Sequence, residues 1–85
     1  LNTWRAALSQ AEASLAQEEA ILLRVKANAA NSRENSRRYQ ELRKLGAVSQ
    51  MDADTKMTEA KTSEAEVAAA GKKVDAMKYA LHQAK

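Results

Sequence analysis

The sequence of 85 residues contains no cysteine, no proline and no phenylalanine, and only two glycines, one tryptophan and two tyrosines. The absence of cysteine excludes disulfide bonds and thiolate metal sites. The absence of proline and the scarcity of glycine argue against a fold rich in loops or β-turns. Because a chain this short also has few large apolar side chains, a compact globular core is not expected.

Alanine, by contrast, is abundant and supplies 19 of the 38 residues in the apolar class. Together with many Glu, Lys, Leu and Arg residues, this composition is typical of coiled coils and long helices. No run approaches the ~20 apolar residues of a membrane span. The first residues, Leu1-Asn2-Thr3-Trp4, lack the pattern of a signal peptide and an initiator Met. We therefore expect a segment of a larger protein, with any membrane anchor outside it.

Apolar and small residues recur at spacings of three and four along both halves of the chain, which is the heptad pattern of a coiled coil. In the first half this stripe contains Leu1, Trp4, Leu8, Ala11, Leu15, Glu18, Leu22, Val25, Ala29, Ser32, Ser36 and Tyr39. In the second half it contains Ala53, Met57, Ala60, Ser63, Val67, Ala70, Val74, Met77, Leu81 and Ala84, with one irregular step at Met57. Helices are therefore predicted at about 2–44 and about 50–84.

The two stripes are separated by a break at about residues 45–49. Gly46 can adopt the left-handed conformation that ends a helix, and Arg43 and Lys44 favour the negative end of the helix dipole before it. Ser49 has the residue type and the position of an N-cap, with Asp52 three residues later. We therefore predict a short turn around Gly46.

Folding the chain at Gly46 pairs residues whose numbers add up to 92, and this single axis brings the two stripes into register. Large residues then mostly face small ones, as when Leu22 faces Ala70. The predicted fold is all-α, an antiparallel two-helix coiled-coil hairpin in which residues 1–85 form one unit. Since both termini lie at the same end, such a hairpin can be inserted into a host domain as one excursion.

The predicted hairpin is not uniform along its length. Its seam is apolar as far as Val25 and again from Val67, but between about Ser32 and Met57 it consists mainly of Ser, Ala and Lys. The end near the turn is therefore expected to be held together less stably. Residues 33–44 also carry five basic and two acidic side chains, a surplus equal to the net charge of +3 of the whole chain. A basic tip is expected.

Three residues at fixed spacing straddle the predicted turn: Arg38, Leu42 and Ser49. With the Gly-Ala-Val-Ser run before and at Ser49, they resemble the tip motif R-x-x-x-L-x-x-x-x-x-x-S of bacterial periplasmic adaptor proteins, also called membrane fusion proteins, of tripartite efflux and secretion systems. All three motif positions match. The chain as a whole resembles the α-helical hairpin of this family, and the motif itself covers about residues 38–52.

The resemblance implies that the hairpin docks by its tip onto a TolC-like outer-membrane channel. In this interpretation Leu42 is buried in a groove between helices, Arg38 binds carboxylate or carbonyl oxygens, and Ser49 binds backbone. Secondary tip contacts are predicted at Arg43, Gly46 and Gln50.

The resemblance also implies a periplasmic location, a ring of six hairpins packed side by side, and a link to an inner-membrane transporter. The arms of about forty residues resemble those of ABC-type exporters more than those of short-hairpin drug–proton systems. No nucleic acid, cofactor or metal is expected in this interpretation.

Two other functions are compatible with the residues alone. The basic residues near the turn are compatible with an arm that grips nucleic acid, like the coiled-coil arm of a seryl-tRNA synthetase, although few aromatic side chains are present to stack on bases. A purely structural spacer would need no specific tip. An enzyme is not expected, because His82 is the only histidine and no phosphate-binding loop is present.

Overall fold

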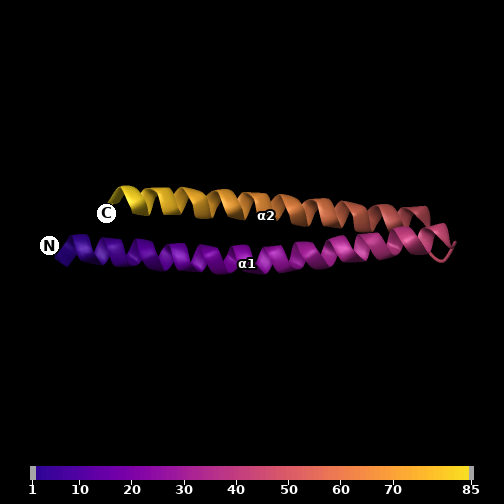
Figure 1. Cartoon of the computed structure of the whole chain (residues 1–85), viewed down its shortest axis with the longest axis horizontal. Coiled ribbons are helices and arrows are strands. Elements are labelled where there is room, and N and C mark those ends of the chain that lie inside the picture. Colours follow the sequence, from indigo (N-terminus) through magenta and orange to yellow (C-terminus); the bar gives the residue numbers. More distant parts are fainter. Residues whose placement is uncertain (1, 85) are drawn as a thin grey trace.

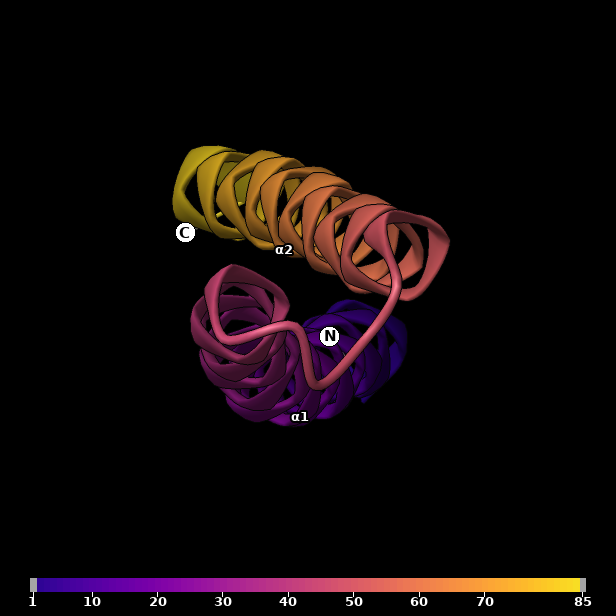
Figure 2. The ribbon, with the colours of Figure 1, turned by 90° about the vertical axis from the view of Figure 1, so that its right-hand side faces the viewer.

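The computed structural model describes residues 2–84 and contains two long helices, α1 (Asn2–Lys44) and α2 (Gln50–Ala84). They lie antiparallel and side by side in a rod of 67 × 14 × 13 Å, with the turn at one end (Figure 1). Viewed from the turn, the two helices are inclined to each other, as in a coiled coil (Figure 2). The predicted all-α hairpin is confirmed.

The turn is closed by local hydrogen bonds around Gly46, which has a φ of 77°. The Gly46 N–H donates to the Arg43 carbonyl at 2.9 Å, and the Ala47 N–H donates to the Leu42 carbonyl at 2.8 Å. This pair of bonds is the Schellman arrangement, which satisfies carbonyls left free at the end of a helix. The positive φ explains why glycine stands at this position.

The two glycines of the chain are expected to respond in opposite ways to replacement by alanine. Gly46→Ala forces a Cβ into the left-handed region and should destabilise the hairpin by about 1–2 kcal/mol. Gly71 lies inside α2, and apart from its chain neighbours and the nearby backbone of its own helix no atom lies within 4 Å of the place that an alanine Cβ would take, so Gly71→Ala should stabilise the hairpin by about 0.5–1 kcal/mol. Thermal unfolding followed by circular dichroism measures both effects. A stabilising Gly46→Ala would contradict the assigned turn.

The seam between the helices contains the seven buried residues of the described chain: Val25, Ala29, Ala53, Ala60, Ser63, Val74 and Leu81. All seven belong to the stripes read from the sequence. Contacts across the seam agree with the predicted register to within a few residues, since Lys73 Nζ lies 2.8 Å from Glu18 Oε1 and Gln40 Nε2 donates to the Ala53 carbonyl at 3.4 Å.

The seam differs from the prediction at one position near the turn. Met57 is 38% exposed, whereas Lys56 is half-buried and its Nζ lies 5.3 Å from the centre of the Tyr39 ring. The seam therefore passes through Ala53, Lys56 and Ala60, and the spacing of three and four is unbroken. The irregular step expected at Met57 is wrong, because the long aliphatic stem of lysine can line a seam while its ammonium stays at the edge.

At the base of the hairpin, Trp4 is 55% exposed. The helices have unequal lengths, 43 residues in α1 and 35 in α2. In the observed register α2 ends near the level of Leu8, so the first turns of α1 extend past it (Figure 1). Trp4 therefore has no residue of α2 to pack against.

Candidate functional site at the hairpin tip

The three motif residues lie at the end of the rod formed by the turn. Arg38 and Leu42 are one helical turn apart on α1, and Ser49 precedes the first residue of α2. The Arg38 side chain is 65% exposed and Leu42 is 37% exposed. Because Leu42 stands at the margin between buried and exposed surface, it has apolar area still available for a partner.

Arg38 belongs to a small charged cluster with Glu34 and Arg37. Arg37 binds the Glu34 carboxylate through two nitrogens at 2.6 and 3.1 Å, whereas Arg38 Nε lies 3.5 Å from Glu34 Oε1. The hydrogen bond from Arg37 is the main reason that the pKa of the Glu34 carboxyl is lowered, and the same bond raises the pKa of Arg37. Exposed pairs at the longer distance contribute little. Arg38 therefore keeps donors free for a partner.

Ser49 caps the N-terminus of α2. Its Oγ accepts a hydrogen bond from the Asp52 N–H at 3.1 Å, and its carbonyl accepts the first helical bond of α2 from the Ala53 N–H. This is the geometry of an N-cap, which satisfies one of the free N–H groups at a helix start. Since the hydroxyl hydrogen takes no part in the cap, Ser49 can still donate to a partner.

The residues predicted as secondary contacts occupy different environments. Gly46 shapes the turn, and Gln50 is exposed and donates to Asp54 Oδ1 at 2.8 Å. Arg43 is half-buried, and its Nε lacks a hydrogen-bond partner within residues 2–84.

Two apolar residues beside the turn, Leu45 and Met51, were not predicted from the sequence as part of the tip surface. They are 82% and 76% exposed. Both stand outside the heptad stripes, so neither can pack in the seam. A large apolar side chain outside the heptad stripes and next to the turn is the sequence feature that could have predicted them.

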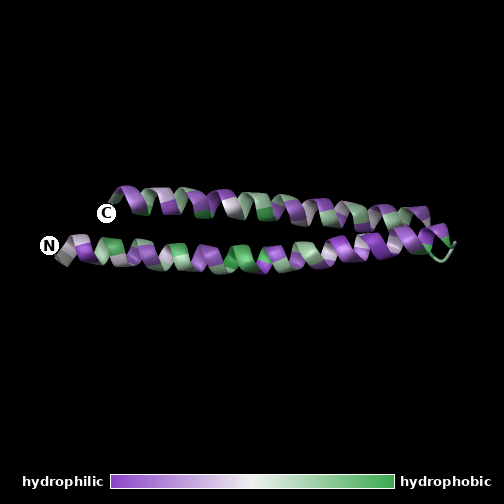
Figure 3. Ribbon diagram, in the orientation of Figure 1, coloured by the Kyte–Doolittle hydropathy of each residue, from purple (hydrophilic) through white to green (hydrophobic). Residues whose placement is uncertain are grey.

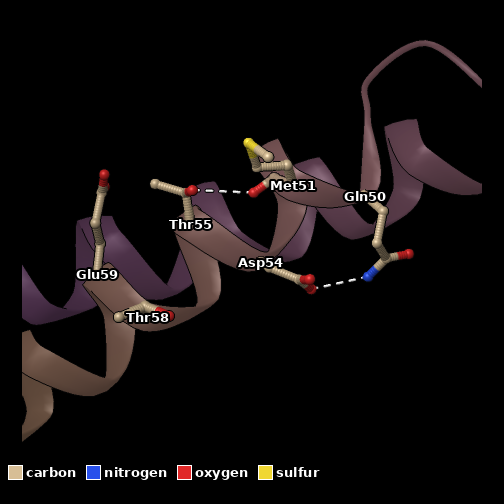
Figure 4. Close-up of a pocket in the computed structure, with 6 residues that line it drawn as sticks. All are labelled: Gln50, Met51, Asp54, Thr55, Thr58 and Glu59. Atoms are coloured by element: carbon tan, nitrogen blue, oxygen red, sulfur yellow. Dashed lines mark hydrogen bonds between the residues drawn. The ribbon is translucent and has the colours of Figure 1, made fainter.

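A shallow hollow lies on α2 next to the turn (Figure 4). It is lined by six exposed residues of this one helix: Gln50, Met51, Asp54, Thr55, Thr58 and Glu59. Gln50 donates a hydrogen bond to Asp54, and the Thr55 hydroxyl donates to the Met51 carbonyl at 2.9 Å. The hollow is therefore an open helix surface with one apolar side chain, suited to contact with another protein surface.

The charge at the tip is divided between the two helices. Residues 33–44 of α1 carry five basic and two acidic side chains, whereas residues 50–66 of α2 carry five acidic and two basic ones. The hairpin places these segments side by side (Figure 1). We call them the basic flank and the acidic flank. The tip is therefore a charge-separated surface. Residues 33–62 carry seven basic and five acidic side chains, so the expected basic surplus is present at the tip and lies on α1.

The described part of the chain contains no group of three or more His, Asp and Glu side chains placed to bind a metal ion. Neither α1 nor α2, as far as they are described, has the length of apolar surface needed to cross a membrane. His82 lies exposed near the base, at the opposite end from the motif.

Comparison with known families identifies the hairpin. Residues 7–84 match the family described as "RND MFP, alpha-helical hairpin domain", in which MFP stands for membrane fusion protein. The chain belongs to this family. The hairpin is thus part of a periplasmic adaptor of tripartite efflux, and hairpins of this family are non-catalytic. No match to a curated protein or to a solved structure was found.

Proposed function

We propose that this hairpin docks by its tip onto a TolC-like outer-membrane channel and so bridges the channel to an inner-membrane transporter. The observation that carries the proposal is the placement of Arg38, Leu42 and Ser49 at the exposed end of the rod, with Arg38 donors free and Leu42 partly exposed. A groove between two channel helices would bury Leu42, while carboxylate or carbonyl oxygens at its rim would accept from Arg38 and Ser49.

The docking is tested by replacing Arg38 with alanine and measuring binding of the hairpin to a purified TolC-like channel in nanodiscs. We expect affinity to fall about tenfold, because an arginine at the centre of an interface often contributes more than about 1 kcal/mol. Arg33→Ala is the matched control, since the two side chains are 68% and 65% exposed and only Arg38 belongs to the motif. Equal losses for both variants would mean non-specific electrostatic attraction.

The proposal extends to the transporter partner and the location. Arm length favours an ABC-type exporter, whereas the matched family is described for RND adaptors. The family match covers nearly the whole hairpin, whereas the argument for an ABC-type exporter uses arm length alone. We therefore favour an RND-type transporter. The hairpin is proposed to lie in the periplasm, and another part of the full-length adaptor is proposed to anchor it to the inner membrane.

A second pair of stripes supports side-by-side packing of hairpins, as in the expected ring of six. Exposed residues on the back of α1 recur at spacings of three and four: Ala13, Ala16, Ala20, Leu23, Ala27 and Ala30. Exposed residues on the back of α2 do the same: Ala65, Ala69, Lys72, Ala76, Tyr79 and Gln83. Between neighbouring hairpins that point the same way, Leu23 would lie level with Ala69, and Tyr79 with Ala13. Large residues again oppose small ones.

Such contacts would join α1 of one hairpin to α2 of the next, and head-to-tail contacts of this kind close into a ring when the rotation from one hairpin to the next adds up to a full turn. The basic and acidic flanks would also face each other between neighbours. A single contact would be weak, and six together would hold the tips on the channel by avidity.

Replacing Leu23, which is 71% exposed, with glutamate is expected to weaken this assembly at least about tenfold, because a charge would be placed against alanines of the neighbour. Sedimentation velocity of the full-length adaptor measures the effect. Lys26→Glu, an exposed substitution off the stripe, is the control. Unchanged assembly of Leu23→Glu would rule out the second seam.

The alternative of a nucleic-acid arm is not favoured by the charge distribution. A backbone of phosphates attracts a surface with excess positive charge, whereas the acidic flank lies beside the basic flank and lowers the positive charge of the tip. A structural spacer predicts that Arg38→Ala and Arg33→Ala are equally silent, so the same experiment separates it from docking.

A further inference from the structure

A polar contact interrupts the seam about a third of the way from the turn to the base. Ser63 is the only buried polar residue among the described ones, at 5% exposure. Its Oγ lies 3.1 Å from Ser32 Oγ and accepts a hydrogen bond from Asn28 Nδ2 at 3.5 Å. We call these three residues the polar node. Open grooves flank it on both sides, so water can reach its edges.

The seam differs in kind on the two sides of the polar node. Toward the base, the buried residues include Val25, Val74 and Leu81. Toward the turn, the buried residues are Ala53 and Ala60, each of which removes little apolar area from water. Figure 3 shows the same change along α1, which is more hydrophilic toward the turn.

We call the segment between the polar node and the turn the neck; it comprises residues 33–44 and 50–62. Besides the small buried side chains of Ala53 and Ala60, its two helices are joined by polar contacts: the Gln40 amide to the Ala53 carbonyl, and the Lys56 ammonium near the Tyr39 ring. Helices of this length are marginal in water when they are not packed. If the neck helices separate, their backbone amides therefore become open to exchange with solvent.

The turn keeps the separated helices tethered. Its hydrogen bonds, such as those from Gly46 to Arg43 and from Ala47 to Leu42, join residues close in sequence and do not cross the seam. Re-closing of the neck is then the closure of a short loop, which has a low entropic cost.

We propose that the polar node divides the hairpin into two units that open separately, so that the helices of the neck separate and re-pair while those of the base remain packed. The opening is a property of the chain alone. Its use, which rests on the proposed docking, is to let the faces that carry Arg38 and Leu42 adjust their direction against the channel. The neck is thus a compliant joint between a rigid base and the docking residues.

Native-state hydrogen exchange of the 85-residue chain, followed residue by residue by NMR, tests the proposal. We expect amides of the neck to exchange on the order of 10- to 100-fold faster than those of residues 15–27 and 66–80, with the step at the polar node. A single exchange rate for the whole chain, either slow or equal to that of an unfolded peptide, would overturn the proposal.

A double variant provides the matched comparison. Ser36→Leu with Lys56→Leu replaces two half-buried seam residues of the neck, and it should reduce the difference in exchange to within about threefold by zipping the neck. Thr58→Leu with Lys61→Leu makes similar changes at exposed positions of the neck and should leave the step in place. An equal effect of the two double variants would mean that helix propensity, and not the seam, sets the exchange, which would refute the proposal. Because no channel is present, the result does not depend on docking.

Discussion

Replacing Leu42 with aspartate is expected to reduce binding of the hairpin to a TolC-like channel by about 100-fold. The substitution removes the apolar knob of the proposed contact and adds a charge that a groove between helices would have to desolvate, which together correspond to about 2–4 kcal/mol. In the full-length adaptor the loss should be larger, because every member of a ring loses its contact at once. Binding to the purified channel and export by cells carrying the variant measure the two effects.

Leu45→Asp is the control for this prediction. Leu45 lies three residues further along, is 82% exposed against 37% for Leu42, and is not part of the motif. If general hydrophobicity at the tip drove docking, the more exposed leucine would be at least as sensitive. A loss confined to Leu42→Asp supports the motif. The helix content of both variants should equal that of the unmodified chain, because Leu42 takes part in the turn through its backbone carbonyl.

Replacing Val74 with aspartate is expected to unfold the hairpin or to lower its stability by more than about 3 kcal/mol. Val74 is 3% exposed and lies in the apolar part of the seam, so its replacement loses buried area and places a charge where solvent is excluded. For a chain this small, a loss of that size is a large part of the total stability. Circular dichroism at increasing temperature measures it.

Ala76→Asp makes a similar change of charge two residues later, on the exposed side of α2, and should stay within about 0.5 kcal/mol of the unmodified chain. An unchanged melting curve for Val74→Asp would mean that the seam of α2 is wrongly assigned.

The fold could be predicted from the sequence because its two stripes were read separately and one axis brought them into register. Gly46, which has a positive φ, marks the turn at which this axis crosses the chain. The error at Met57 arose because hydrophobicity alone ranks methionine above lysine. Position in the heptad favoured Lys56, whose stem lines the seam and whose ammonium lies near Tyr39.

Less of the candidate site than of the fold could be predicted from the sequence. The motif of Arg38, Leu42 and Ser49 was found by its resemblance to a family, since periodicity assigns these residues no special role. The charge separation at the tip was missed because a count along the chain treats residues 33–44 in isolation. Only the hairpin geometry sets them beside the acidic side chains of residues 50–66. The exposure of Trp4 depends on where α2 ends relative to α1.

The basic and acidic flanks give each hairpin an electric dipole that is perpendicular to the rod. The rod is 14 × 13 Å across, and fields between exposed charges decay over about 8 Å at physiological ionic strength. The dipole therefore acts between adjacent rods in contact and has little effect at longer range. In the proposed ring, this dipole would set the rotation of each rod about its own axis, so that each hairpin would face its neighbour with one particular side. Raising the salt concentration should remove this rotational preference before it affects the apolar seam within each hairpin.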